Sequence, residues 1–234
     1  MRTTTHARSP AHTLIPALAI LASIVFQAPA ANASLIGVDV SDMYLIEALP
    51  EFVPVKGVST LTREEDGVDV LISTSELASM GAYTLWWVVF NNPGACAAAF
   101  MCGADSDFSD PAVDVSVLWG AGFLSDMDGF LTFSAELGEN EPPGEVLLGN
   151  PNGLLDSGVA EIHVVLRVHT NDGVPVEAGQ VAEWVSSYNG GCPDGVGCAD
   201  EQFAVHPSPI PLPASVWMFG TALGLLGWLR RRIV

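Results

Sequence analysis

Apolar and polar residues alternate with a period of two through the middle of the chain. Gly67–Thr74 alternates around Val68, Val70 and Ile72, and Val113–Trp119 places its apolar side chains on one face. This pattern is typical of β-strands with one buried face. Short segments rich in β-branched and aromatic residues, separated by Gly, Pro, Asn and Asp, are further predicted strands: 35–40, 43–49, 58–63, 130–137, 160–170, 180–186 and 202–206.

The segment Ala82–Phe90 differs because both of its faces are apolar. Tyr83, Leu85, Trp87 and Val89 lie on one side of the predicted strand, and Trp86, Val88 and Phe90 are among the residues on the other. Such a strand belongs in the middle of a layered structure. We therefore predict one all-β domain, a β-sandwich or jelly roll, over residues 34–206.

The first 33 residues have the layout of a secretory signal peptide. Arg2 and Arg8 precede an apolar stretch, Leu14–Phe26, and Ala31-Asn32-Ala33 forms a small-x-small cleavage site for signal peptidase. Ala28-Pro29-Ala30 is an alternative site. The apolar stretch is short for a membrane span, which needs about 20 residues. We expect export across the inner membrane.

The C-terminal end combines a Pro-rich segment, an apolar stretch and a basic cluster. Residues 207–215 form the predicted linker, 216–229 a short transmembrane helix, and 230–234 a cytoplasmic tail that starts with three arginines. The simplest interpretation is a permanent C-terminal anchor that leaves the acidic domain outside. The core of the linker reads Pro209, Ile210, Pro211, Leu212, Pro213 and Ala214.

This motif, the glycine-rich apolar stretch and the terminal arginines together resemble the VPLPA type of PEP-CTERM sorting signal, with Ile210 in place of Val. The resemblance covers roughly the last 25 residues. It implies that an exosortase-type membrane protease recognises the motif and removes the tail. It also implies a Gram-negative host and a protein that is first anchored in the membrane, then released to the cell surface or to extracellular polysaccharide.

Charge excludes one class of partner. Residues 34–209 contain three basic residues, Lys56, Arg63 and Arg167, against 27 acidic ones. A surface this acidic repels phosphate backbones, so we expect no nucleic-acid binding.

The four cysteines form two C-x5-C pairs, Cys96 with Cys102 and Cys192 with Cys198. An even number of cysteines in an exported chain predicts disulfides. Three connectivities are possible, and we favour the local one, with Cys96 bonded to Cys102 and Cys192 bonded to Cys198. A zinc site is the alternative, although this spacing is not the usual one.

One predicted strand carries several polar side chains. Alternation places Glu161, His163, Arg167 and His169 on the face opposite Ile162 and its apolar neighbours. We expect a solvated face with a charge ladder. The alternative is a metal or anion site, but the two histidines lie about 20 Å apart along a straight strand and cannot share one ion. A metal would need one histidine with carboxylates from elsewhere, or with His206.

Two acidic loops are candidate Ca²⁺ sites, since paired carboxylates beside a glycine can bind a hard cation. Their aspartates are Asp105, Asp107 and Asp110 in one loop and Asp126 and Asp128 in the other. Neither completes an EF-hand. The alternative is that these acids keep the surface soluble.

No catalytic motif is present in the sequence. It has no G-x-S-x-G, no H-E-x-x-H, no P-loop and no dinucleotide-binding fingerprint, and no resident cofactor is predicted. The run from Gly67 to Cys102 resembles a group of bacterial secreted proteins with no established activity. We therefore expect a non-enzymatic surface or matrix component, with extracellular polysaccharide or Ca²⁺ as candidate ligands. The alternative is a secreted glycan hydrolase that uses Glu161, His163 or His169.

Overall fold

The computed structural model describes residues 37–169, 181–192 and 198–209. The predicted signal peptide, the motif residues after Pro209, the predicted transmembrane helix and the basic tail lie outside these ranges. Within the described ranges, no helix has the length and apolar character needed to cross a membrane.

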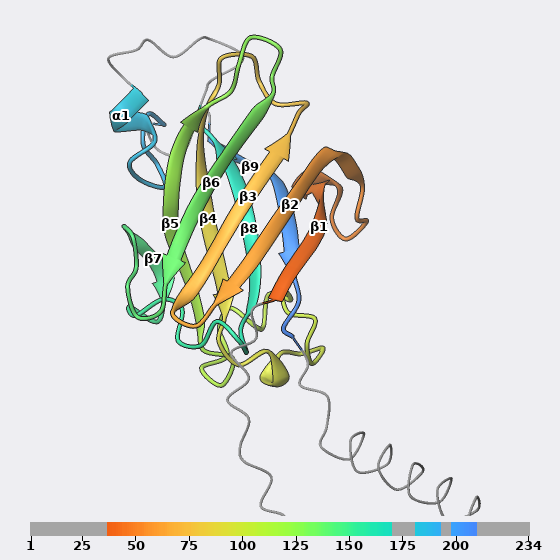
Figure 1. The fold of residues 1–234 in the computed structure, drawn as a ribbon, viewed down its shortest axis with the longest axis vertical. Coiled ribbons are helices and arrows are strands. Elements are labelled where there is room, and N and C mark those ends of the chain that lie inside the picture. Colours follow the sequence, from red (N-terminus) through yellow and green to blue (C-terminus); the bar gives the residue numbers. More distant parts are fainter. Residues whose placement is uncertain (1–36, 170–180, 193–197, 210–234) are drawn as a thin grey trace, which may run out of the picture. The chain divides into compact units, whose positions relative to one another are not determined.

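Nine antiparallel strands form a single sheet, in the order β6-β3-β2-β1-β9-β8-β4-β5-β7 (Figure 1). Their bounds are β1 Gly37–Leu45, β2 Pro54–Glu64, β3 Gly67–Thr74, β4 Ala82–Phe90, β5 Val115–Leu124, β6 Leu131–Gly138, β7 Val146–Gly149, β8 Glu161–Val168 and β9 Ala199–His206. Two short 3-10 helices, Ile46–Ala48 and Pro93–Ala95, and one helical turn, α1 (Val181–Trp184), complete the described elements.

The sheet curls into a half-barrel that brings distant strands together. Phe133 on β6 stacks on Phe123 of β5, with ring centroids 3.6 Å apart, although six other strands separate these two in the sheet order. The all-β prediction is therefore confirmed, but the strands form one curled sheet where two packed sheets were predicted. Alternation cannot distinguish these architectures, because both bury one face of each strand.

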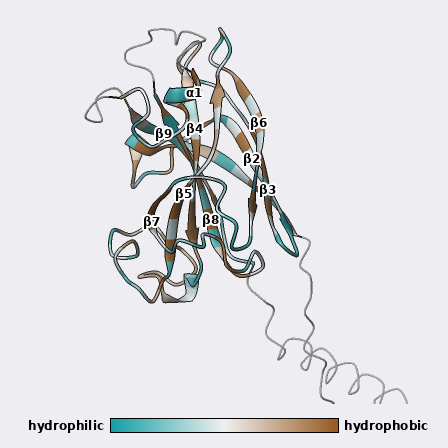
Figure 2. Cartoon of the chain, turned by 90° about the vertical axis from the view of Figure 1, so that its left-hand side faces the viewer, coloured by the Kyte–Doolittle hydropathy of each residue, from teal (hydrophilic) through white to brown (hydrophobic). Residues whose placement is uncertain are grey.

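Strand β4 lies between β8 and β5, and all nine of its residues are buried, as its two apolar faces predict. Leu85 and Trp87 belong to the large core on the concave side, whereas Val88 and Phe90 belong to a smaller cluster on the outer side. Figure 2 shows apolar stretches on β4, β5 and β8. The outer face of these strands is covered by loops.

Two segments differ from the predicted strands. The described part of 180–186 begins with the turn α1 and contains no strand, so the strand prediction there is wrong. This segment packs against the sheet from outside: the Trp119 indole donates a hydrogen bond to the Val185 carbonyl at 2.8 Å. Gly122 permits the approach, since a Cβ there would lie 2.3 Å from the Val185 Cβ. Strand β7, which was not predicted, pairs with β5 at the sheet edge.

Candidate functional site

Two loop segments cover the outer face of β8. The first cap, residues 93–114, follows β4 and contains the disulfide Cys96–Cys102. The second cap, residues 181–192, contains α1 and is joined by the disulfide Cys192–Cys198 to the start of β9. Both disulfides have the favoured local pairing, and no free cysteine is present.

The predicted solvated face of β8 is therefore wrong. The exposed fraction is 1% for Glu161, 6% for Arg167 and 0% for His169. Alternation places these residues opposite the concave core, as predicted, but period two cannot show that loops distant in sequence cover that face. The predicted charge ladder forms only in part, because Glu161 contacts His163 whereas Arg167 pairs with Asp200.

At the first cap, Glu161 holds the disulfide loop against β8. Its Oε1 atom accepts hydrogen bonds from the Cys102 backbone N–H at 2.8 Å and from His163 Nε2 at 2.9 Å. Its Oε2 atom is buried without a hydrogen-bond partner. The imidazole of His163 packs edge-on against Phe90, with ring centroids 5.0 Å apart. The carboxylate at this end of the strand is thus an acceptor that ties the loop to the sheet.

At the second cap, Arg167 holds the chain around Tyr188. Its Nε donates to the Tyr188 carbonyl at 2.9 Å, and its Nη1 donates to Asp200 Oδ1 at 2.7 Å. The guanidinium lies 3.7 Å from the centroid of the Tyr188 ring, a cation–π contact. The other neighbour of this ring is Trp86, at 5.2 Å in an edge-to-face arrangement.

His169 joins the second cap to β4 through a series of hydrogen bonds. Nδ1 lies 2.7 Å from the Gly190 carbonyl oxygen, which can only accept, so Nδ1 carries the proton. Nε2 therefore accepts from the Thr84 hydroxyl at 2.7 Å, and Thr84 Oγ1 in turn accepts from the Trp86 indole at 2.8 Å. Burial lowers the pKa of His169 more than the Gly190 hydrogen bond raises it, which favours the neutral ring.

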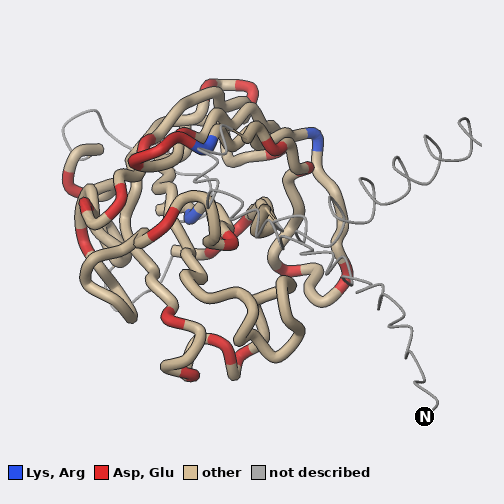
Figure 3. The backbone as a smooth tube through the Cα atoms, turned by 60° about the horizontal axis from the view of Figure 1, so that its bottom comes forward, with Lys and Arg blue, Asp and Glu red and all other residues tan. Residues whose placement is uncertain are grey.

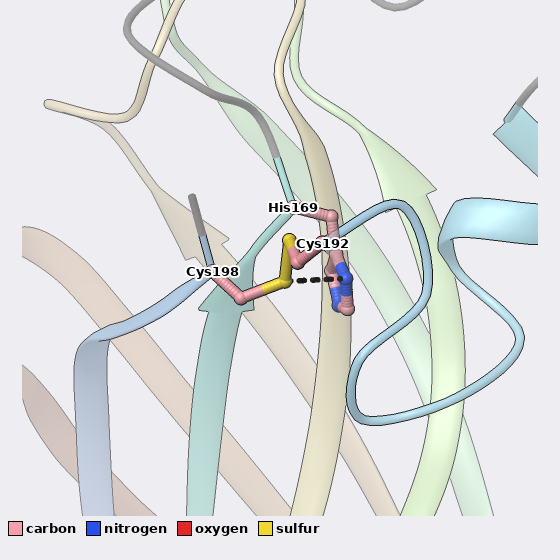
Figure 4. Close-up of side chains that lie close together, drawn as sticks. All are labelled: His169, Cys192 and Cys198. Carbon is pink, nitrogen blue, oxygen red and sulfur yellow. Dashed lines mark hydrogen bonds between the residues drawn. A yellow bond between two sulfur atoms is a disulfide. The ribbon is translucent and has the colours of Figure 1, made fainter. Parts of the chain in front are cut away.

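The imidazole of His169 also faces the disulfide, with Cys198 Sγ 3.4 Å from Nδ1 (Figure 4). His169, Cys192 and Cys198 are the one group of three potential metal ligands within the described ranges, with ligand atoms inside 4.8 Å. Both sulfurs are joined in the disulfide, so neither is a thiolate ligand in this state. The predicted alternative of a zinc site is not formed here.

Of the five predicted Ca²⁺ ligands, Asp107, Asp110 and Asp126 accept backbone hydrogen bonds in their own loops, and the five do not converge. Asp126 Oδ1 accepts from the backbone N–H groups of Asp128 and Phe130, at 2.9 and 2.7 Å, in the turn before β6. Asp110 accepts from the Ala112 N–H at 2.8 Å. Asp105 and Asp128 are exposed. Across the described ranges, these aspartates form no group of three potential metal ligands.

Asp107 is the exception in burial, with 1% exposed. Its carboxylate accepts three backbone hydrogen bonds within the first cap, from Ala97 at 2.8 Å and from Gly103 and Ala104 at 2.9 Å. Burial raises the pKa of Asp107, but these three N–H donors outweigh burial and hold the pKa below its ordinary value. Asp107 is thus the internal support of the first disulfide loop.

A hydrogen-bonded Ser–His–Asp series lies on the concave side of the sheet, and sequence reasoning missed it. His206 Nδ1 donates to Asp39 Oδ2 at 2.8 Å, and the Ser59 hydroxyl lies 2.8 Å from Nε2. The three residues come from β1, β2 and β9, and 147 positions separate Ser59 from His206. No spacing rule detects such a series, because the curl of the sheet creates it.

The serine and the histidine of this series are closed off from solvent, whereas the Asp39 side chain is 38% exposed. Ser59 and His206 are both 0% exposed. Burial lowers the pKa of His206 more than the Asp39 hydrogen bond raises it, so the ring is neutral and Nε2 accepts from Ser59. The backbone of Ser59 lies in the sheet, where Ser59 faces Ser41 on β1 and Ile72 on β3. The arrangement satisfies buried polar groups and leaves no open path to the hydroxyl.

Two surface hollows are present on the described part of the chain, the first at the end of the first cap and the second along β3 and β6. One, of about 340 Å³, is lined by residues that include Phe108, Asp114 and Asn150. The other, of about 350 Å³, is lined by acidic side chains that include Asp69 and Glu136, which face each other across β3 and β6. Figure 3 shows acidic residues spread around the domain. The basic residues within the described ranges are Lys56, Arg63 and Arg167.

No known family model matches the chain, and a search of curated proteins finds no similar sequence.

Proposed function

We propose that this chain is a non-enzymatic exported protein that acts as a component of the cell surface or extracellular matrix. The observation that carries the proposal is the use of the polar side chains of β8. Glu161 and Arg167 on β8, and His169 directly after it, hold two disulfide-closed caps onto the sheet, and His163 hydrogen-bonds to Glu161. Local disulfides of this kind point to an oxidising, extracytoplasmic location.

The resemblance of the C-terminal segment supports the proposed route. Signal peptidase removes residues 1–33, and the chain is held by its apolar C-terminal stretch until an exosortase-type protease cuts at the motif 209–214. The domain then reaches the surface or the medium. Extracellular polysaccharide is the proposed partner class. Nucleic acid is not a proposed partner, because the acidic surface of the domain would repel its phosphates.

The route is tested by altering the motif in the native host. Pro211, Leu212 and Pro213 are replaced together by Gly-Ser-Gly, and a matched control carries Ile210→Val, which changes the same motif but keeps its resemblance to the VPLPA type. We expect the motif variant to stay in the membrane fraction with its tail attached, while the control is released like the natural chain. Release of the motif variant would contradict sorting by this signal, and retention of the natural chain with its tail in the membrane fraction would favour an ordinary anchor.

A second candidate function is supported by the Ser59–His206–Asp39 series. Distances of 2.8 Å on both sides of the imidazole match what nucleophilic serine catalysis needs. That chemistry would make the protein an exported esterase acting on acylated glycans, with Ser59 as nucleophile, His206 as general base and Asp39 as the residue that orients His206. The full burial of Ser59 opposes it.

Active-site labelling separates the two candidates. The natural protein and a Ser59→Ala variant are treated with a fluorophosphonate, which bonds covalently to activated serines. The non-enzymatic proposal predicts no label on either protein. Labelling of the natural protein that disappears in Ser59→Ala would overturn it and establish the esterase.

A further inference from the structure

The two disulfides are closely matched in their local setting. Both close a C-x5-C loop, and their Cα atoms are 5.3 and 5.8 Å apart. In each pair the first cysteine is buried, with 6% of Cys96 and 3% of Cys192 exposed, and the second is half-buried. The sulfur of each second cysteine lies 3.8 Å from a carbonyl oxygen, that of Pro93 for Cys102 and that of Gly190 for Cys198.

The two disulfides differ in the side chain that faces the second cysteine. His169 Nδ1–H donates to the Gly190 carbonyl at 2.7 Å and also lies 3.4 Å from Cys198 Sγ, so the two acceptors share this N–H. The hydrogen bond from Thr84 to Nε2 acts together with Gly190 to keep the proton on Nδ1. A fixed N–H donor stabilises a thiolate at Cys198. At the first cap the neighbouring side chain is the buried Glu161 carboxylate, which accepts the Cys102 N–H. A carboxylate disfavours a thiolate in its vicinity.

We propose that Cys192–Cys198 is a redox-active disulfide that exchanges with small dithiols, whereas Cys96–Cys102 is a resistant structural bond. This activity goes beyond the proposed surface role. Cys198 is the half-buried member of the pair, so it is the sulfur that an external reagent attacks.

The exchange has two balanced steps. A thiolate of the dithiol attacks Cys198 Sγ, forms a mixed disulfide and expels Cys192 as a thiolate, which takes up a proton. The second thiol of the reagent then attacks the reagent sulfur of the mixed disulfide and releases Cys198. His169 Nδ1–H stabilises the departing Cys198 thiolate. The protein disulfide gains two electrons and two protons, and the dithiol loses them as it closes its own ring.

The two charged side chains near His169, those of Arg167 and Asp200, have opposite charges and form an ion pair with each other. Arg167 on β8 and Asp200 on β9 lie close enough to His169 to affect its pKa in opposite directions, and they bond to each other at 2.7 Å. The Tyr188 ring packs on the guanidinium. The proposal therefore depends on the His169 N–H donor and not on the net charge of its neighbours.

The test is reduction of the full exported protein by dithiothreitol under native conditions. Samples taken over time are alkylated, and peptide mass mapping reports each disulfide separately, so Cys96–Cys102 is an internal control. We expect Cys192–Cys198 to open about tenfold faster. Equal rates, or faster opening of Cys96–Cys102, would overturn the proposal.

Paired variants at Thr84 test the hydrogen-bond series without removing the imidazole. Thr84→Ser keeps the hydroxyl and should keep the fast rate, whereas Thr84→Val removes it and should slow opening of Cys192–Cys198 toward that of Cys96–Cys102. Circular dichroism confirms that each variant is folded. If a folded Thr84→Val variant reacts as fast as the natural protein, the series has no part in the exchange and the proposal fails.

A measurement on the unmodified chain keeps the proposal testable if Thr84→Val does not fold. The reduced protein reacts with iodoacetamide across a pH range, and the pH profile gives the pKa of the Cys198 thiol. The proposal predicts a value below the ordinary 8.5 or so of a free cysteine. A value at or above that of a free cysteine would contradict it.

Discussion

The first and second caps cover opposite ends of the same strand with different chemistry. The first cap is organised from inside by Asp107, and it meets β8 through a carboxylate that accepts a backbone N–H. The second cap is organised from the sheet, because Arg167 and His169 reach up to carbonyl groups of residues 188–190. Identical cysteine spacing thus closes one self-supporting loop and one loop that depends on the side chains beneath it.

The largest expected effect comes from the internal support of the first cap. Asp107→Ala leaves three backbone donors without their acceptor and should lower the free energy of unfolding by about 3 kcal/mol. Urea denaturation measures this change. Asp105→Ala, at an exposed position two residues away, is the matched control and should change stability by less than about 0.5 kcal/mol. Equal effects of the two variants would show that Asp107 does not support the loop.

The second cap should respond most to loss of its contact with β8. Arg167→Ala removes the hydrogen bonds to Tyr188 and Asp200 and the contact with the Tyr188 ring, and should cost about 2 kcal/mol. Arg167→Lys keeps the charge without the planar donor arrangement and should recover only part of this loss. Amide hydrogen exchange should rise in residues 181–192 and stay unchanged in 93–114. An equal rise of amide exchange in both caps would contradict the claim that Arg167 supports the second cap alone.

Acid should loosen the second cap before the first. Folding lowers the pKa of His169 below its ordinary value of about 6.5. As the pH falls, His169 is therefore protonated in the unfolded chain at a higher pH than in the folded protein. The contribution of His169 to stability is lost as pH falls below about 6.5. The slope is at most about 1.4 kcal/mol per pH unit for each such histidine, and His206 adds to the global value.

The first cap should respond in a more acidic range. The pKa of Asp107 is also lowered, so its contribution is complete above the ordinary carboxyl value of about 4 and is lost as pH falls through the lower folded value. Local amide exchange, followed from pH 7 to pH 3, distinguishes the caps where a global measurement would not. Loss of protection in 93–114 at higher pH than in 181–192 would contradict this assignment.

The smallest effect is expected from Tyr188→Phe. The ring provides the contacts with Arg167 and Trp86, and the backbone carbonyl of residue 188 accepts from Arg167. Phenylalanine preserves all of these, so stability should change by less than about 0.5 kcal/mol in thermal unfolding. Tyr188→Leu, which loses the aromatic ring, serves as the comparison and should destabilise more.

Local sequence patterns predict the strands and the disulfides, but they do not predict which loops cover the outer face of a strand. The two apolar faces of Ala82–Phe90 identify the central strand, and short cysteine spacing favours local pairing. The burial of Glu161 and His169 depends on caps that lie far away in sequence, so alternation alone suggests solvent exposure.

Two other features depend on tertiary arrangement. The segment after residue 180 is rich in strand-forming residues, yet it packs on Trp119 and Gly122 instead of joining the sheet. The Ser59–His206–Asp39 series exists because the sheet curls enough to bring β1, β2 and β9 side chains together. Local sequence contains no information on that curvature.

The central claim is an exported domain closed by two local disulfides and freed from its tail. The most direct test is the intact mass of the protein recovered from the native cell surface and medium, before and after reduction. We predict a chain that begins near Ser34, ends between Pro209 and Ala214, and gains about 4 Da on reduction. A chain that still extends to Val234, or that gains no mass on reduction, would contradict the account.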